Sequence, residues 1–325
     1  MNRGFIGGLC FSVAFAFLAG CGGSQPAIGT PGTIPQAPAV TQHAARGKPW
    51  TFQDSSSNDL IYVVGVNGEK ITTYVVSYAN GSIVSTFEAP SYPNSLCSDN
   101  QGNVFMPLKG EVLEYSHGGT SPVATLDDKG FRTLGCAVDP ISGDLAVANL
   151  ATTHSGNGNI ALYHQGSGTP KFFKADWISN YFSCTYDDNG NLVVDGSNHS
   201  GYDLLAVLPK NSKTFRALQF DSSLNLGVLR WDGQHVTVND NARNIYQLAI
   251  SGGKATVVGK TVLYTGGRLH LDYWLQGGVV LSATGPHHSM IGEWKYPKGR
   301  KPVVRYSMGK KSDLEAITVS VAASR

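Results

Sequence analysis

The side chains best suited to binding or catalysis are imidazoles, amides, carboxylates and aromatic rings that stand just after short apolar segments. Four polar segments, 150–159, 196–201, 240–244 and 284–290, carry His154, His199, Asp240, Arg243, His287 and His288. The apolar segments before three of them end in Asn149, Asp195 and Asn239. Aromatic rings beside amides and carboxylates suit a sugar-like or peptide-like ligand.

No complete catalytic constellation accompanies these residues. No glycine-rich stretch follows a strand and opens a helix, as a Walker loop, a dinucleotide-binding motif or a serine nucleophile elbow would. His270, His287 and His288 lack a spacing that fixes tetrahedral zinc geometry, because adjacent residues on a strand point to opposite faces. The sequence favours a binding surface over an enzyme and leaves catalysis open.

The elements that would position these side chains repeat along the chain. A turn that opens with Asp and contains Gly recurs at 99–102, 139–143 and 187–190, with looser copies at 231–234 and 275–278. The glycines are 41, 47, 43 and 44 residues apart. Asp favours the start of such a turn, and Gly adopts its positive φ readily. This period is typical of the four strands of a propeller blade.

A second element recurs within each repeat. A tyrosine followed by a glycine leads to a proline, and the pairs are Tyr115 with Pro122, Tyr163 with Pro170, and Tyr296 with Pro302. Within one unit, the pattern predicts strands at 134–138, 145–148, 160–163 and 171–173. The second strand of a blade is expected six times, near 60–65, 103–107, 144–148, 191–194, 235–239 and 278–282.

The chain end predicts how the ring closes. Residues 314–320 read as a strand that no further blade follows, and the first blade lacks an inner strand before residue 60. The last strand should therefore complete the first blade, which leaves no large exposed sheet edge. We predict an all-β, six-bladed β-propeller over residues 51–325, monomeric in solution.

Two groups of loops share one face of such a ring. They are the loops between the second and third strands and the loops that join one blade to the next. The blade-joining loops are expected to contribute Tyr92, Arg132, Trp177 and Tyr181. Since binding residues concentrate on loops held by a rigid scaffold, we take this face as the candidate binding face.

The second strands carry a family resemblance. The stretches 143–149 and 190–195 resemble the Gly-x-Leu-x-Val strand of NHL-like and gluconolactonase-like propellers. Gluconolactonase-like enzymes hold a divalent cation with Glu, Asn and Asp oxygens, which suit a hard ion such as calcium. The resemblance implies Asn149, Asp195 and Asn239 as weak metal candidates, with Asp195 as the base. Glu69 does not have the spacing of the family's glutamate.

A histidine-based lyase is a further alternative. Propellers similar to streptogramin lyase use histidines, and the positions of His199 and His288 are compatible with that arrangement. Neither residue is part of a specific motif. The interpretation we prefer is a non-catalytic ligand-binding or protein-interaction module, with a metal-dependent lactonase-like hydrolase as the alternative.

The chain start has the layout of a secretory signal. Arg3 precedes an apolar run from Gly4 to Phe17, and Leu18-Ala19-Gly20-Cys21 follows. These four residues resemble the lipobox of bacterial lipoproteins. The resemblance implies cleavage after residue 20 and acyl chains on Cys21, which together form a stable membrane anchor. Gly22 in place of an aspartate implies the outer membrane in a host that has one.

Residues 21–50 are expected to form a disordered tether. Five prolines stand there among Gly, Ala, Thr and Gln, a composition that buries too little apolar surface to offset the entropy of ordering. We therefore predict three parts: a signal peptide at 1–20, a lipidated tether at 21–50 and the propeller at 51–325. The protein is expected to lie outside the cytoplasm, with an envelope protein, peptide or glycan as its partner.

The charge pattern argues against nucleic acid as a partner. The chain carries 25 basic and 23 acidic side chains, a formal net charge of +2, with no block of five like charges. The pairs Arg300-Lys301 and Lys310-Lys311 are too short to predict a basic patch and read as solvated edges.

Three cysteines remain besides Cys21 and the signal segment. Cys97, Cys136 and Cys184 stand at similar places in successive repeats. A disulfide needs Cα atoms within about 7 Å, and neighbouring inner strands are expected to lie farther apart. We predict small, buried packing residues, with one disulfide and one spare thiol as the alternative.

Overall fold

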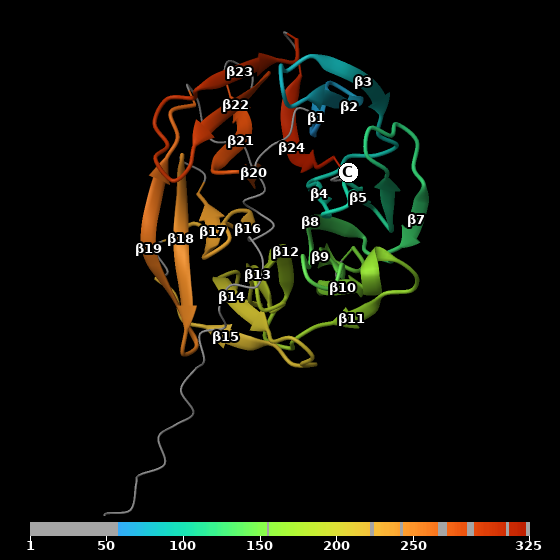
Figure 1. Ribbon diagram of the computed structural model, residues 1–325. Coiled ribbons are helices and arrows are strands. Elements are labelled where there is room, and N and C mark those ends of the chain that lie inside the picture. The colour runs from blue at the N-terminus through green and yellow to red at the C-terminus, as the bar shows by residue number, and fades with distance from the viewer. Residues whose placement is uncertain are drawn as a thin grey trace, which may run out of the picture. The chain divides into compact units, whose positions relative to one another are not determined.

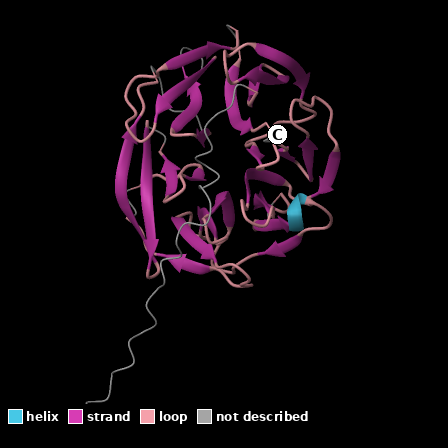
Figure 2. Ribbon diagram, viewed as in Figure 1, coloured by secondary structure: helices cyan, strands magenta, loops and turns pink. Residues whose placement is uncertain are grey.

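The computed structural model describes residues 58–154, 156–221, 224–240, 243–265, 272–284, 289–309 and 312–322. These residues form six antiparallel sheets of four strands each, arranged as blades around an axis (Figure 1). Their one helix is a 3-10 turn at His164–Gly166 (Figure 2), and no helix among them is long and apolar enough to cross a membrane. The predicted signal peptide, Cys21 and the tether lie outside the described residues.

The first three blades follow the predicted order from the axis outward. Blade 1 contains β24 (Asp313–Ser320), β1 (Leu60–Asn67), β2 (Lys70–Ser77) and β3 (Ile83–Glu88). Blade 2 contains β4 (Cys97–Ser98), β5 (Val104–Leu108), β6 (Glu111–Tyr115) and β7 (Ala124–Asp127). Blade 3 contains β8 (Arg132–Val138), β9 (Leu145–Ala151), β10 (Asn159–Tyr163) and β11 (Lys171–Phe173).

The last three blades repeat this order. Blade 4 contains β12 (Asn180–Tyr186), β13 (Leu192–Ser197), β14 (Asp203–Leu208) and β15 (Arg216–Leu218). Blade 5 contains β16 (Leu229–Trp231), β17 (Val236–Asn239), β18 (Asn244–Ser251) and β19 (Lys254–Val262). Blade 6 contains β20 (Tyr273–Gln276), β21 (Val279–Thr284), β22 (Met290–Lys295) and β23 (Val304–Ser307). All six predicted second strands are confirmed.

The two ends of the propeller sequence meet in blade 1. The red β24 lies beside the blue β1 in Figure 1, and Leu60 pairs with Ser320 at one end of an antiparallel ladder. A register shift between Val64 and Gly65 accommodates a bulge. The predicted closure by the last strand is confirmed, so hydrogen bonds join the first and last segments of the ring.

The repeated turns have the expected chemistry. The Asp99 carboxylate accepts hydrogen bonds from the backbone N–H groups of Gln101 and Asn103, at 2.9 and 2.8 Å. Gly102 and Gly190 have φ values of +86° and +76°, which favour glycine. A local interaction therefore builds the same link between first and second strands in successive blades.

The hydrophobic core lies in the seams between neighbouring blades. Along β9, Ala146 and Ala148 pack toward blade 4, whereas Leu145 and Val147 pack toward blade 2. This alternation follows from the two-residue period of a strand. Strands such as β5, β9 and β13 are buried on both faces, which explains why they are almost continuously apolar rather than amphipathic.

The prediction that all three cysteines are unpaired packing residues is wrong for two of them. Cys97 and Cys136 form a disulfide between blades 2 and 3, with their Cα atoms 5.7 Å apart. Inner strands converge on the axis and therefore come closer than expected. Cys184 is a free, buried thiol, so the alternative of one disulfide and one spare thiol describes the protein.

Candidate functional site

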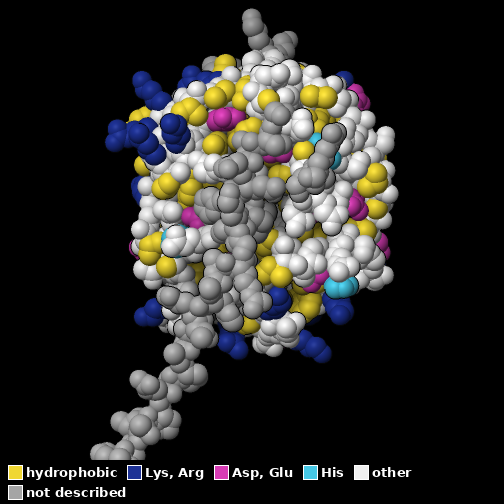
Figure 3. Space-filling model, viewed as in Figure 1, with side chains coloured by type: hydrophobic (Ala, Val, Ile, Leu, Met, Phe, Trp, Pro, Cys, Tyr) yellow, Lys and Arg dark blue, Asp and Glu magenta, His cyan; other side chains and the backbone are white. Residues whose placement is uncertain are grey.

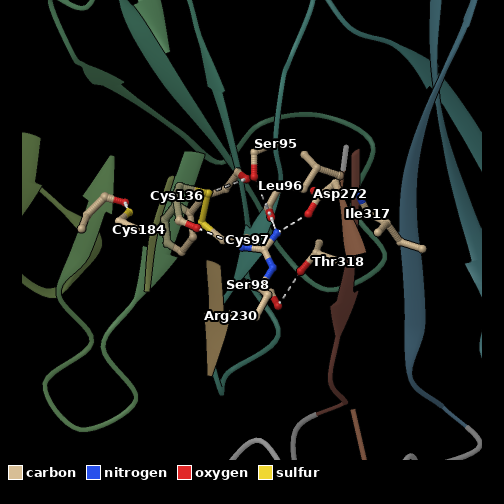
Figure 4. Close-up of a disulfide and its surroundings, with 12 residues drawn as sticks. Ser95, Leu96, Cys97, Ser98, Cys136, Cys184, Arg230, Asp272, Ile317 and Thr318 are labelled. Carbon is tan, nitrogen blue, oxygen red and sulfur yellow. Dashed lines mark hydrogen bonds and ion pairs between the residues drawn. A yellow bond between two sulfur atoms is a disulfide. The ribbon is translucent and has the colours of Figure 1, made fainter. Parts of the chain in front are cut away.

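The axis of the ring is occupied by the side chain of Arg230, which is only 6% exposed (Figure 4). Its Nη2 lies 2.7 Å from Asp272 Oδ1 and donates to the Leu96 carbonyl at 3.3 Å. Its Nε and Nη1 donate to the carbonyls of Tyr273 and Cys136, at 3.0 and 3.4 Å. The guanidinium thus joins the inner strands of blades 3, 5 and 6 to the segment that enters blade 2.

Asp272 extends this network to blade 1. Its carboxylate accepts hydrogen bonds from the backbone N–H groups of Tyr273 and Ile317, at 2.8 and 3.2 Å. Burial raises the pKa of Asp272, although the Arg230 charge opposes the shift. Arg230 also lies over the Trp274 ring, 5.1 Å from its centroid. These bonds give the Arg230–Asp272 pair a structural role in holding blades together.

The space beside Arg230 is too small for a substrate. A cavity of about 30 Å³ lies next to the guanidinium, lined by the Cys97–Cys136 disulfide, Thr185 and Trp231 among others, and holds roughly two water molecules. Its lining residues come from the ends of the inner strands that lead into the Asp–Gly turns. It therefore opens away from the candidate binding face.

Asn149 lies in the seam between blades 2 and 3. Its Nδ2 donates to Asn159 Oδ1 at 2.9 Å and to Asp128 Oδ1 at 3.3 Å. The Tyr163 hydroxyl also donates to Asp128, at 3.2 Å. Burial raises the pKa of Asp128 to about 6, opposed by the hydrogen bonds from Asn149 and Tyr163. Asn149 is therefore engaged with its own blade and the segment that enters it.

Asp195 and Asn239 lie in two other seams. Asp195 is fully buried on the same strand face as Val193, which packs with Leu229 of blade 5. Its pKa is raised well above the ordinary value by burial. Asn239 Oδ1 accepts the backbone N–H of Val228 at 2.6 Å, on the face of β17 that points toward blade 6. The weak metal candidates thus occupy three separate seams.

Glu69 is the one further metal candidate that the described residues include. Glu69 lies in the exposed turn between β1 and β2. Among the residues that the structure describes, no three His, Cys, Asp or Glu side chains are placed to hold one metal ion. His270, His287 and His288 lie outside those residues.

The other predicted face residues divide into exposed groups and structural groups. His154, Trp177, His199 and Arg243 are exposed. His199 Nε2 lies 2.9 Å from the Asp176 carbonyl, which places it beside the loop that carries Trp177. Asp240 is nearly buried, and its Oδ1 accepts the backbone N–H groups of Arg243 and Asn244 at 2.9 Å each. It therefore stabilises a turn.

The predicted blade-joining residues divide in the same way. Tyr92 and Arg132 are exposed. Tyr181 is fully buried, and its hydroxyl accepts the Ala175 N–H at 2.9 Å.

A groove on blade 3 combines polar and aromatic side chains on this loop face. It has a volume of about 530 Å³ and is lined by Lys129, Thr152, Asn157, Gly158, Asn159, Phe172 and Lys174. The Phe172 ring is 44% exposed, so one wall offers an apolar surface. Amide groups and two ammonium groups complete the lining.

A tilted pair of rings lies on the two loops that border the groove. The rings of Phe131 and His154 have centroids 4.2 Å apart, and Lys109 Nζ lies 4.4 Å from the Phe131 centroid. Phe131 is two residues from Lys129, and His154 is two residues from Thr152. Aromatic and cationic groups therefore extend from the groove onto these two loops.

Sequence reasoning selected His154 here but missed Phe131, Phe172 and Lys129. Asn157 and Asn159 fall in the predicted 150–159 loop without having been singled out. A usable signal was present, because Phe172 stands in a predicted outermost strand, which has no further strand along its outer edge and is more exposed than the inner strands. Arg230 and Asp272 gave no such signal.

Comparisons with known proteins show which folds the chain is similar to. No family model and no curated protein matches the chain. A protein of unknown function from Bacteroides caccae has a TM-score of 0.56 at 13% identity, over 80% of this chain and 98% of its own. A chain in a nidogen/laminin complex has a TM-score of 0.59 at 14% identity, over 81% and 99%.

A third similar structure is the propeller domain of Myceliophteria thermophila Cps50 (Swd1), with a TM-score of 0.52 at 12% identity, over 79% of this chain and 86% of its own. Likeness at such identities concerns the fold and not the activity. The chain contains an all-β, six-bladed β-propeller.

Proposed function

We propose that the protein is a lipid-anchored propeller of the cell envelope that acts as a non-catalytic binding module, with an envelope glycan as the ligand of the blade 3 groove. The observation that carries this proposal is the pairing of an exposed Phe172 ring with amide and ammonium groups in one groove. Sugar rings pack on aromatic faces, and their hydroxyls bind amides. The filled axis supports a surface site rather than a funnel.

The groove is open to solvent at its surface, which suits an extended chain better than a small metabolite. Lys129 and Lys174 add affinity for a glycan that carries carboxylate or phosphate groups. A peptide or a partner protein is the competing occupant. Purified envelope polysaccharide should bind the groove if the ligand is a glycan, and should not bind it if the ligand is a peptide or a protein.

The groove is tested by binding of purified envelope polysaccharide to the wild-type protein and to Phe172→Ala. We expect affinity to fall by roughly tenfold, which corresponds to about 1.4 kcal/mol, because the variant loses the apolar surface on which a sugar ring would pack. Ile141→Ala is the matched control, since Ile141 is an exposed apolar residue of the same blade outside the groove. Equal affinities for the three proteins would overturn the groove assignment.

The anchor rests on the resemblance of Leu18-Ala19-Gly20-Cys21 to a lipobox. We propose acyl chains on Cys21, location outside the cytoplasm and, in a host with two membranes, the outer membrane. Intact mass measurement of the protein from bacterial membranes tests this directly. We expect the mass of a chain cut before Cys21 with added acyl groups, and Cys21→Ser should lack them. An unmodified wild-type chain would contradict the anchor and leave the groove proposal standing.

A metal-dependent lactonase-like hydrolase is the second candidate, and Asp195 is the observation that favours it. Its carboxylate is fully buried, and its oxygens make no hydrogen bond of good geometry within the described residues. Metal content and thermal melting with calcium or with a chelator test this candidate. Stoichiometric metal whose binding raises the melting temperature, together with hydrolysis lost in Asp195→Ala, would favour the enzyme.

A further inference from the structure

The outer edge of blades 5 and 6 carries basic side chains almost without acidic ones. The described segments 243–265 and 289–309 contain eight Lys and Arg residues and one carboxylate, Glu293. Glu293 is only 7% exposed, and its Oε1 accepts the Tyr306 hydroxyl at 2.9 Å. Since the whole chain has a formal net charge of +2, the rest of the chain is net acidic. Charge is therefore segregated onto this edge.

Tertiary structure turns separate short pairs into one surface. A groove of about 420 Å³ is lined by Tyr264, Lys295, Lys298, Gly299, Arg300, Lys301 and Val303. We call these residues the basic rim. Figure 3 shows Lys and Arg side chains gathered at the upper left edge of the molecule, where Figure 1 places the loop between β22 and β23. The sequence-based reading of Arg300-Lys301 as an isolated solvated pair is therefore incomplete.

The end of β19 holds the basic rim in place. The Arg300 N–H donates to the Val262 carbonyl, and the Tyr264 N–H donates to the Arg300 carbonyl, both at 2.6 Å. The Thr261 hydroxyl donates to the Pro297 carbonyl at 2.9 Å. The loop is thus fastened to the neighbouring blade, and its cations are presented on an ordered backbone.

Exposed apolar side chains lie in the same two segments, and two of them, Tyr264 and Val303, line the basic rim itself. Val258, Tyr264 and Val303 are 55, 50 and 53% exposed, and Val257 is 39% exposed. Such residues add nothing to the binding of a highly charged soluble polymer. They do suit the boundary between lipid headgroups and acyl chains, where Tyr places an apolar body beside a polar tip and Lys extends its charge toward phosphate.

We propose that the basic rim binds the surface of an anionic phospholipid bilayer through its phosphate headgroups. This inference does not require lipid on Cys21, because the rim belongs to the propeller itself. Its cations would provide salt-dependent attraction to anionic headgroups. The exposed valines and Tyr264 would enter the interface, so that blades 5 and 6 face the membrane.

The test is sedimentation of the full chain with Cys21→Ser in every protein, so that acylation contributes nothing. Vesicles are phosphatidylcholine alone or phosphatidylcholine mixed with phosphatidylglycerol. The test variant is Lys295→Glu, Lys298→Glu and Lys301→Glu, which leaves Arg300 intact because its φ is +76°. The matched control is Lys210→Glu, Lys213→Glu and Arg216→Glu, an equal charge change at exposed positions of blade 4.

We expect binding to phosphatidylglycerol vesicles that weakens with salt and falls by roughly a hundredfold in the rim variant, at about fivefold per lost cation. The blade 4 variant should lose much less. Val258→Ser with Val303→Ser should weaken vesicle binding but not binding to soluble polyphosphate. Thermal melting checks that every variant folds.

Three outcomes would overturn the proposal. The first is failure of the folded parent to bind phosphatidylglycerol vesicles, and the second is equal loss in the rim and blade 4 variants. The third is a valine variant that binds both vesicles and polyphosphate as tightly as the parent does. That result would identify a soluble polyanion as the ligand. None of these outcomes bears on glycan binding at the blade 3 groove.

Discussion

Arg230 and Asp272 form a buried ion pair of 2.7 Å at the axis, between the inner strand of blade 5 and the residue just before that of blade 6. Arg230 also hydrogen-bonds to the carbonyls of Leu96 and Cys136, and Asp272 accepts the Ile317 N–H. The pair therefore contacts segments of five blades. At the axis the pair holds neighbouring blades together, as hydrophobic packing does in the seams.

Removal of Arg230 should destabilise the propeller strongly. Arg230→Met leaves the Asp272 charge buried without its partner, a change that costs about 3–5 kcal/mol in the free energy of unfolding. Arg230→Met with Asp272→Asn should lose less, because no uncompensated charge remains. Chemical denaturation measures both, with exposed Arg132→Met as the control. An Arg230→Met protein as stable as the wild type would show that the pair does not hold the blades.

The Cys97–Cys136 disulfide should stabilise the fold measurably. It spans a sequence separation of 39 residues, and closing such a loop in the unfolded chain contributes about 3–4 kcal/mol. We expect reductant to lower the denaturation midpoint of the wild type and to leave Cys97→Ala with Cys136→Ala unchanged. A wild-type midpoint that does not respond after thiol titration confirms reduction would contradict this prediction.

Cys184 is the internal control for that experiment. Burial raises the pKa of its thiol to about 12, and the thiolate is the reactive form. We expect iodoacetamide to label Cys184 only after unfolding, and Cys184→Ala to keep the wild-type response to reductant. Rapid labelling of Cys184 itself in the folded, oxidised protein would show that this seam opens.

Asp128 should make stability depend on pH. Its pKa in the folded protein, about 6, lies above the ordinary value of 3.8. The stabilising contribution is therefore complete below about pH 4 and is lost as pH rises through 6. The loss is about 3 kcal/mol, because one pKa unit corresponds to about 1.4 kcal/mol.

Asp128→Asn tests this contribution, because asparagine resembles the protonated carboxyl. We expect the variant to be more stable than the wild type at pH 7.5 and to lose the step between pH 4 and 6. Asp127→Asn, at the exposed neighbouring position, should keep the step. A wild-type step that persists in Asp128→Asn would assign the titration to another group.

Ring closure through β24 should be essential for folding. A chain that ends at Gly309 lacks β24, so the edge of β1 is exposed. It also loses Leu314 and Ile317, which pack in the seam between blades 1 and 6. We expect it to be insoluble or to lose its cooperative thermal transition. A chain that ends at Ala322 is the control and should melt like the wild type. A soluble, cooperative shorter chain would mean that five complete blades and a three-stranded blade 1 suffice.

The blade count and its strand order could be predicted because they depend on local chemistry. The Asp99–Gly102 turn forms through hydrogen bonds among five consecutive residues. A glycine such as Gly102 indicates a turn by its residue type alone. Repetition of this turn at a period of 41–47 residues then determined the six blades. The unpaired strand at 314–320 determined how they close.

The candidate binding face was predicted only in part, because exposure is not a local property. His154, Trp177 and His199 are exposed on the predicted loops, whereas Tyr181 is buried and Asp240 stabilises a turn. Sequence position placed all five on the same face. Only packing against neighbouring blades decided which of them a ligand can reach.

Contacts between blades were decided by the tertiary structure. Cys97 pairs with Cys136 because inner strands converge on the axis, and Arg230 meets Asp272 across two blades. Asn149 and Asp195 both stand near the ends of their second strands but enter different seams, because they are one position out of register and their side chains therefore point to opposite faces of their sheets. By itself the sequence determined the ring through short-range turn chemistry, whereas distances and side-chain directions across the ring depend on how all six blades pack together.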